Sequence, residues 1–140
     1  MYNLLAVGAD PEFFLADPKN NNRPVPAIGL IGGTKEKPKF INDDGFSAVQ
    51  EDNVMVEFNT KPAQTAEEFV RNHMMVMIYL GRVIKKKGLV PLITPVAEFT
   101  EAELSHPQAQ EIGCSADFSA WTEKRNIPCN PETLGRIRTS

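Results

Sequence analysis

Residues 65–88 constrain the fold more than any other part of the chain, because they carry the marks of both ends of one long amphipathic helix. Thr65 and Glu68 have the spacing of a capping box, in which a hydroxyl and a carboxylate satisfy each other's backbone donors. One stripe at helical spacing is formed by Phe69, His73, Val76, Leu80 and Val83. Lys85-Lys86-Lys87-Gly88 predicts the C-terminal end, since basic side chains suit the helix dipole there and glycine stops a helix.

The segments on either side of this helix have the composition of β-strands. Strands are expected at residues 4–7, 13–15, 40–41, 46–50 and 89–94. Residues 42–45 read Asn-Asp-Asp-Gly and predict a turn, so the second arm of a hairpin would start at Phe46 and run on toward Glu57. Strand hairpins followed by one long helix and a returning strand are typical of an α+β fold. We therefore expect an antiparallel sheet with a long helix packed on one face.

The length of the chain favours a single domain over residues 1–140. A hydrophobic share of 41% in 140 residues is enough for a real core and fits an ordinary water-soluble protein. A short helical stretch is expected around residues 101–104, and residues 105–140 are expected to be extended and rich in loops. A segment of that kind and length indicates a connector that packs on something else.

Acidic and amide side chains gather in two strand-like segments. Side chains two apart on a strand share a face, so Asp10 and Glu12 can point together, as can Glu57 and Asn59. With Asp52, they would form an acidic face whose carboxylates repel one another unless a cation neutralises them. Their hard oxygen ligands suit Mg²⁺ or Mn²⁺. The alternative is a sheet face on which the acids simply face water.

The charge balance argues against nucleic acid and anionic membrane as partners. The formal net charge is -3, from 15 basic and 18 acidic residues, and offers neither of them bulk attraction. A metal-dependent nuclease built on Asp52 and Glu57 is disfavoured for the same reason. The sequence has no apolar run of about eighteen residues and no signal-peptide pattern at its start. We expect a cytoplasmic protein whose Cys114 and Cys129 are reduced thiols.

A glycine-rich basic loop occupies residues 31–38, which read Ile-Gly-Gly-Thr-Lys-Glu-Lys-Pro. Its backbone amides and two lysines could contact phosphate. The spacing is not that of a P-loop, so an ordinary mobile surface loop is the alternative.

Four segments, taken in order, resemble the phage carboxylate-amine ligase family (COOH-NH2 ligase type 2). They are residues 8–13, 31–38, 50–59 and 113–122. Their order and spacing cover nearly the whole chain. That family is similar to the glutamine synthetase and glutamate-cysteine ligase superfamily, in which acidic residues of the catalytic sheet hold magnesium against ATP. The resemblance implies part of a glutamine-synthetase-like catalytic domain that forms amides through an acyl phosphate.

The resemblance also implies roles for individual residues. The metal ligands that it implies are Asp10 and Glu12 from the first acidic motif, Asp52 and Glu57 from the second, and Asn59 as an assisting ligand. Lys35 and Lys37 match the basic loop, which implies contact with phosphate or with a substrate carboxylate. The implied cofactors are ATP and Mg²⁺ or Mn²⁺, and the implied substrates are a small-molecule or peptide carboxylate and an amine.

Members of this family continue beyond a strand like residues 135–139 into a Gly-Gly-His-x-His motif and a further half-domain. The chain is therefore expected to correspond to the N-terminal half of such a ligase, located in the host cytoplasm if it is phage-encoded. A second chain or a homo-oligomer could complete the site. The alternative is a catalytically inactive fragment that acts as a binding or assembly module.

Overall fold

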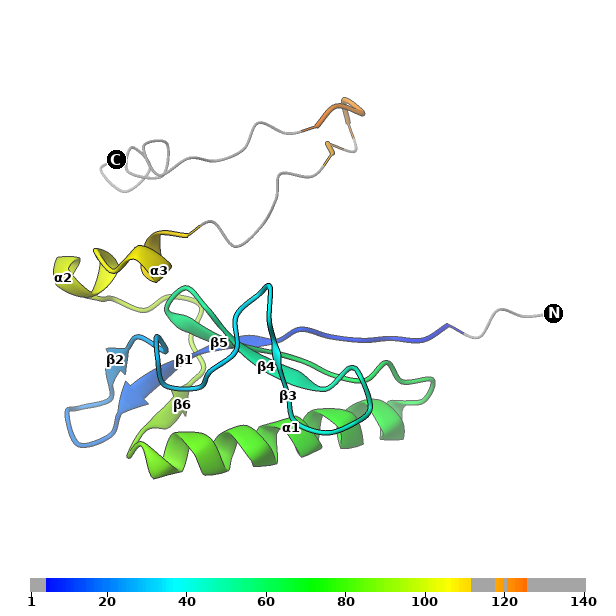
Figure 1. Cartoon of the computed structure of the whole chain (residues 1–140), viewed down its shortest axis with the longest axis horizontal. Coiled ribbons are helices and arrows are strands. Elements are labelled where there is room, and N and C mark those ends of the chain that lie inside the picture. The colour runs from blue at the N-terminus through cyan, green and yellow to red at the C-terminus, as the bar shows by residue number, and fades with distance from the viewer. Residues whose placement is uncertain (1–4, 112–117, 120, 126–140) are drawn as a thin grey trace.

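A computed structural model of the chain describes residues 5–111, 118–119 and 121–125, and its fold is α+β with an antiparallel sheet (Figure 1). The elements are β1 (Glu12–Asp17), β2 (Arg23–Val25), β3 (Lys39–Phe40), β4 (Ala48–Asp52), β5 (Met55–Asn59), α1 (Ala66–Lys86), β6 (Val90–Leu92), α2 (Glu101–Leu104) and α3 (Pro107–Gln110). The strand order is β2-β1-β5-β4-β3, and β6 pairs with β1. The expected antiparallel sheet and long helix are confirmed.

Helix α1 begins where the sequence predicted, but its cap differs in one bond. The Thr65 hydroxyl accepts from the Glu68 backbone N–H at 3.2 Å, as expected. The Glu68 carboxylate accepts instead from the Gln64 N–H at 2.9 Å, so the reciprocal capping box on Thr65 is wrong. His73 is half-buried and contacts the Phe69 carbonyl through Nδ1 at 3.1 Å.

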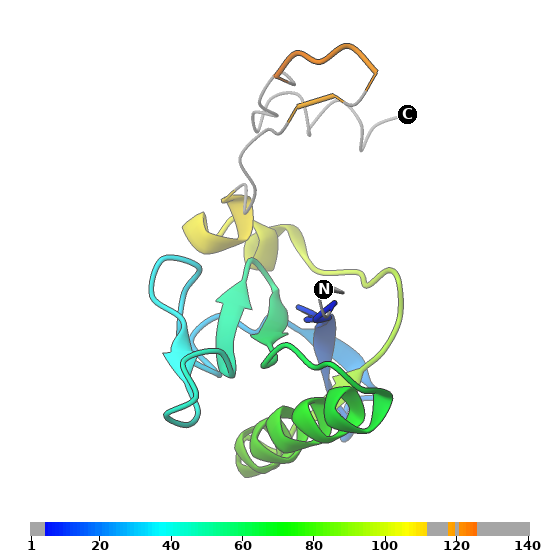
Figure 2. The ribbon, with the colours of Figure 1, turned by 90° about the vertical axis from the view of Figure 1, so that its right-hand side faces the viewer.

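The core lies between α1 and one face of the sheet (Figure 2). Its sheet residues include Phe13, Leu15, Val49, Val56 and Phe58, and its helix residues are Val76, Leu80 and Ile84. Alternate side chains along a strand point to opposite faces. The residues between these apolar positions on β1, β4 and β5 therefore point away from α1, and that second face carries the acidic side chains.

The chain reverses at Asn53-Val54, where the sequence predicted a continuous arm toward Glu57. Strand β4 ends at Asp52 and β5 starts at Met55, and the two strands pair with Gln50 opposite Glu57. Asn53 has φ +54°, a left-handed conformation that asparagine tolerates better than most residues. The hairpin between β3 and β4 is confirmed. Asp44 accepts there from the N–H groups of Phe46 and Ser47 at 2.8 and 2.7 Å.

No strand forms at residues 5–7, where one was expected, and residues 1–4 lie outside the described residues. Val7 makes only an isolated bridge with Ala63. Between this bridge and β1, the chain follows β5 through two bonds, in which Phe58 N–H donates to the Pro11 carbonyl and Thr60 N–H to the Ala9 carbonyl, both at 3.2 Å. Pro11 has no N–H to donate in return, so a regular ladder cannot continue through it.

Helix α3 lies within the segment after residue 105 that is expected to be extended and rich in loops. Pro107 stands at its first turn, where the missing N–H costs nothing, and the His106 ring accepts from the Gln108 N–H at 3.2 Å. The expected helix α2 is confirmed and is tied to β2 by an Arg23–Glu103 ion pair at 2.8 Å. Most of residues 112–140, including Cys114 and Cys129, lies outside the described residues.

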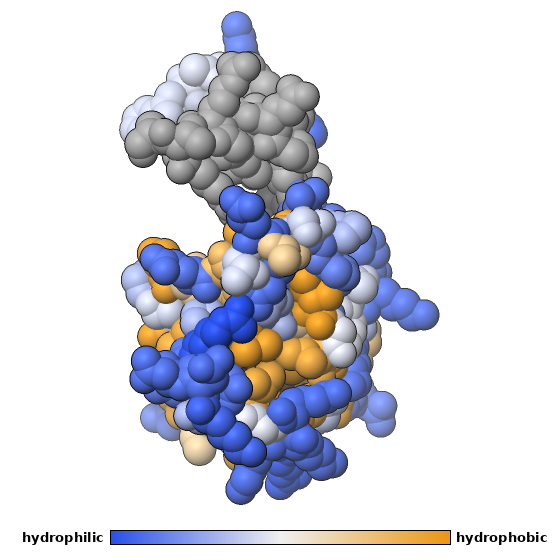
Figure 3. Space-filling model, turned by 90° about the vertical axis from the view of Figure 1, so that its left-hand side faces the viewer, coloured by the Kyte–Doolittle hydropathy of each residue, from blue (hydrophilic) through white to orange (hydrophobic). Residues whose placement is uncertain are grey.

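Hydrophobic residues remain at the surface beside β6. Figure 3 shows the side of the molecule on which β2, β6 and α2 lie, with a hydrophobic area surrounded by hydrophilic side chains. In the segment after β6, Ile93 and Val96 are strongly exposed. Within the residues that the structure describes, no helix has the length and apolar character needed to cross a membrane.

Candidate metal centre

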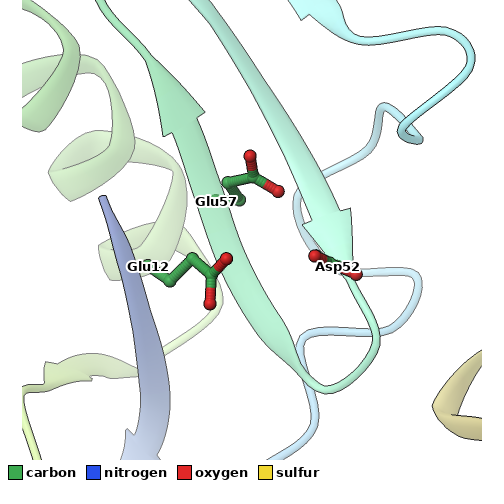
Figure 4. A group of neighbouring side chains, drawn as sticks. All are labelled: Glu12, Asp52 and Glu57. Atoms are coloured by element: carbon green, nitrogen blue, oxygen red, sulfur yellow. The ribbon is translucent and has the colours of Figure 1, made fainter. Parts of the chain in front are cut away.

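Three carboxylates from adjacent strands meet on the sheet face opposite α1 (Figure 4). Glu12, Asp52 and Glu57 each place one oxygen so that the three atoms lie within 4.8 Å of one another. The register explains this convergence. Glu12 is directly opposite Glu57 in the β1–β5 pair, and Asp52 lies two residues beyond Gln50, the partner of Glu57 in β4. All three side chains therefore share one face.

The electrostatics of this cluster favour a bound cation. Burial raises the pKa of Glu12, and the charges of Asp52, Glu57 and Asp10 raise it further, whereas Lys35 acts in the opposite direction. Ionising Glu12 thus costs more in the folded protein than in water. A divalent cation held between the three oxygens would offset that cost.

Two amide side chains next to the cluster position its carboxylates. Gln50 Nε2 donates to Glu57 Oε2 at 2.7 Å, and Asn53 Nδ2 donates to Asp52 Oδ1 at 3.3 Å. Asn53 Oδ1 is buried and has no hydrogen-bond partner among the residues that the structure describes. An unpaired buried oxygen beside Asp52 fits a site that binds a cation, because a cation would accept that oxygen as a ligand. Sequence reasoning missed both amides, because their roles depend on the β4–β5 hairpin.

Asp10 and Asn59, the other two expected ligands, lie at the edge of this arrangement. Extending the β1–β5 register through the bonds to Ala9 and Pro11 sets Asp10 opposite Asn59. Asp10 is exposed and is not part of the three-carboxylate group, although its charge reaches Glu12. Asn59 is half-buried on the same face as Glu57, roughly 7 Å further along β5 at the usual strand rise.

The two expected lysines occupy different positions around a small pocket beside the cluster. The pocket has a volume of about 200 Å³ and is lined by Thr34, Lys35, Glu36, Glu51, Asp52, Asn53, Gln108 and Glu111. Thr34 and Lys37 close a tight turn through mutual backbone bonds of 3.0 and 3.1 Å, with Lys35 inside that turn. Lys35 thus lines the pocket, and its charge also acts to lower the pKa of Glu12. Lys37 is exposed and is not one of the lining residues.

The carboxylate of Glu51 holds the glycine-rich loop, a role that sequence reasoning did not assign. Glu51 is 8% exposed and accepts from the backbone N–H groups of Ile31 and Gly32 at 2.8 and 2.7 Å and of Gly29 at 2.8 Å. Gln108 Nε2 adds a fourth contact at 3.3 Å. Burial alone would raise the pKa of Glu51, but the bonds from Gly32, Gly29, Ile31 and Gln108 outweigh it and lower the pKa below its usual value.

These contacts change the interpretation of the loop. The amides of Gly29, Ile31 and Gly32 bind the protein's own carboxylate, so they cannot serve as the phosphate cradle that the composition suggested. What the loop offers to the carboxylate cluster is the charge of Lys35.

Comparisons with known proteins leave the interpretation to this geometry. No family model, no curated protein and no solved structure matches the chain.

Proposed function

We propose that this chain carries the metal-binding part of an ATP-dependent carboxylate-amine ligase with a glutamine-synthetase-like catalytic sheet. The observation that supports it most is the convergence of Glu12, Asp52 and Glu57 within 4.8 Å. Carboxylate oxygens of this kind suit Mg²⁺ or Mn²⁺, and such a cation would neutralise the phosphates of ATP. Lys35 in the adjoining pocket adds a second positive group.

The proposed reaction has two steps. An oxygen of the substrate carboxylate attacks the γ-phosphorus of ATP, the bond to the bridging oxygen breaks, and ADP leaves. The amine then attacks the acyl carbon, the bond to phosphate breaks, and the amine nitrogen loses a proton as the amide forms. Negative charge concentrates in the first step, so Glu12, Asp52 and Glu57 would act by holding the metal and Lys35 by attracting phosphate or carboxylate oxygens.

A catalytically inactive module completed by another chain is the second candidate. The pocket of about 200 Å³ is smaller than the 300–1,000 Å³ typical of pockets for drug-sized ligands. A pocket of this size would enclose only part of a nucleotide. A separate groove of about 900 Å³ runs along the outer side of α1 and is lined mainly by apolar side chains, which favours a role in assembly.

Metal binding is tested first, by calorimetric titration of Mn²⁺ and Mg²⁺ into the whole chain. Asp52→Asn removes one ligand from the cluster and is expected to abolish the binding heat. The matched control is Asp43→Asn, the same chemical change at an exposed position in the β3–β4 turn, and it should bind as the unmodified chain does. Equal binding by both variants would overturn the metal site.

Ligase activity is tested with hydroxylamine in place of the amine substrate. An acyl phosphate reacts with hydroxylamine to give a stable hydroxamate, so ATP, Mg²⁺ and a panel of amino-acid and peptide carboxylates should yield hydroxamate and ADP together. The yield should fall with Asp52→Asn but not with Asp43→Asn. Metal and ATP binding without any hydroxamate would favour the inactive module over the ligase.

A further inference from the structure

Helix α1 has a second apolar stripe on the side that faces away from the core. Val70, Met74 and Ile78 are 55%, 57% and 53% exposed, and they lie opposite the buried stripe of Val76 and Leu80. A surface helix normally places polar residues there. Met74 is therefore not a core residue.

This outer stripe lines the groove of about 900 Å³. Ile41 and Asn42, from the loop after β3, line the other side. Asn42 Nδ2 contacts Met75 Sδ at 3.5 Å, which holds the loop against the helix. The groove is therefore bounded by an ordered wall and has room beside α1 for another element.

The residues that line the groove from α1 are arranged symmetrically about a point between Met74 and Met75. Apart from Ala66 they are Glu67, Val70, Arg71, Met74, Met75, Ile78, Tyr79 and Arg82. The positions pair about this point as 67 with 82, 70 with 79, 71 with 78 and 74 with 75. Two copies of the helix, laid antiparallel, would set every lining position against another lining position.

We propose that this face binds a second copy of the same chain, with the two α1 helices packed antiparallel about a two-fold axis between Met74 and Met75. In this arrangement each Glu67 lies against the partner's Arg82, at both ends of the stripe. The methionines meet on the axis, and Val70 packs against the ring of the partner's Tyr79. The same pairing sets Arg71 against the partner's Ile78. A largely apolar centre and complementary charged ends are what a self-complementary interface needs.

Charge pairing favours the antiparallel orientation of the two copies over the parallel one. A parallel pair of helices would bring Glu67 against Glu67 and Arg82 against Arg82, and like charges in contact are unfavourable. The interface also lies on the opposite side of the sheet from Glu12, Asp52 and Glu57. Dimer formation and metal binding can therefore fail independently of each other.

Charge reversal across the axis tests the pairing. Analytical ultracentrifugation of the whole chain should give a concentration-dependent species of twice the 15.5 kDa of one chain. Glu67→Arg alone, or Arg82→Glu alone, is expected to weaken the dimer by about tenfold or more, since each change acts at two symmetry-related contacts. The double variant restores the attraction with the signs exchanged and should dimerise like the unmodified chain. Lys19→Glu, an equal charge change at an exposed position in the turn after β1 and away from the groove, is the control.

Disulfide trapping tests the orientation. On a background with Cys114→Ser and Cys129→Ser, Met74→Cys places a thiol next to its own symmetry mate and should cross-link under mild oxidation. Lys85→Cys lies on the same outer face, but its symmetry mate is about 31 Å away at 1.5 Å rise per residue, so it should stay monomeric on a denaturing gel.

Three results would overturn the proposal. A monomer at all concentrations would mean that the groove binds a different segment or partner. A dimer that the double charge variant does not restore would place the interface elsewhere. Cross-linking through Lys85→Cys would indicate parallel helices.

Discussion

Glu51 and Asp52 are adjacent in β4, yet their carboxylates lie in opposite environments. Glu51 accepts four hydrogen bonds, three of them from backbone amides, and its pKa is lowered. Asp52 points to the other face and joins Glu12 and Glu57, where burial and mutual repulsion raise the pKa of Glu12. One carboxylate is held by four donors of the fold, whereas the other three are gathered against one another. This difference separates a structural acid from candidate ligands.

The largest effect is expected from removing the satisfied carboxylate. Glu51→Ala leaves the buried N–H of Ile31 and the part-buried N–H groups of Gly29 and Gly32 without their acceptor. A fully buried unsatisfied donor costs about 1–3 kcal/mol and a part-buried one less, so the free energy of unfolding should fall by about 3 kcal/mol in urea denaturation. Asp52→Ala, the adjacent control, should cost far less. Equal losses at the two positions would remove the distinction between them.

The backbone that brings these amides to Glu51 is tested at Gly33. Its φ is +85°, and an added Cβ would clash with the Val49 carbonyl oxygen. Gly33→Ala should therefore destabilise the protein by about 2 kcal/mol. Gly29 also has a positive φ, +72°, but has open space around the added atom, so Gly29→Ala should cost about half as much. The same urea measurement compares the two variants. A larger loss for Gly29→Ala would contradict the close approach of Gly33 to Val49.

Metal addition tests the three-carboxylate group of Glu12, Asp52 and Glu57. At ten times its dissociation constant, Mn²⁺ or Mg²⁺ should stabilise the folded chain by about 1.4 kcal/mol, seen as a rise in melting temperature that a chelator reverses. Glu51 contributes no oxygen to the three-carboxylate group, so the rise should persist in Glu51→Gln and vanish in Asp52→Asn. A rise that persists in Asp52→Asn would assign the ion to another place.

The smallest effect is expected from neutralising Glu12 in the absence of metal. Its pKa is raised above the ordinary value of 4.5, so its charged form is disfavoured by folding. Its stability contribution is present below pH 4.5 and is lost as the pH rises through the raised pKa. Glu12→Gln should then stabilise the metal-free chain at pH 7, by about 0.5 kcal/mol because the side chain is exposed and screened.

Glu51 should change the free energy of unfolding with pH in the opposite direction. Its pKa is lowered, so its contribution is present above the ordinary value of 4.5 and is lost as the pH falls through the lowered pKa. Urea denaturation as a function of pH, with Glu12→Gln and Glu51→Gln beside the unmodified chain, separates the two. Parallel pH profiles for both variants would show that the two carboxylates share one environment.

Much of the fold could be predicted from local patterns. The stripe from Phe69 to Val83 and the cap at Thr65 are marks that a helix imposes on its own residues, so α1 was predicted with nearly correct bounds. The β3–β4 turn carried its signal in the Asn-Asp-Asp-Gly sequence. The reversal at Asn53-Val54 was missed, because Val54, Val56 and Phe58 alternate as in a strand from the turn onward and Asp52-Asn53 contains neither glycine nor proline.

For the candidate site, the sequence by itself determined which acids share a strand face, since that follows from the two-residue period of a strand. The tertiary structure decided which of them meet. Glu12 comes from a strand some forty residues away from Asp52 and Glu57 in sequence, and only the sheet register sets the three together. It also decided that Glu51 serves the fold, because a carboxylate is structural or free according to the donors that distant backbone brings to it.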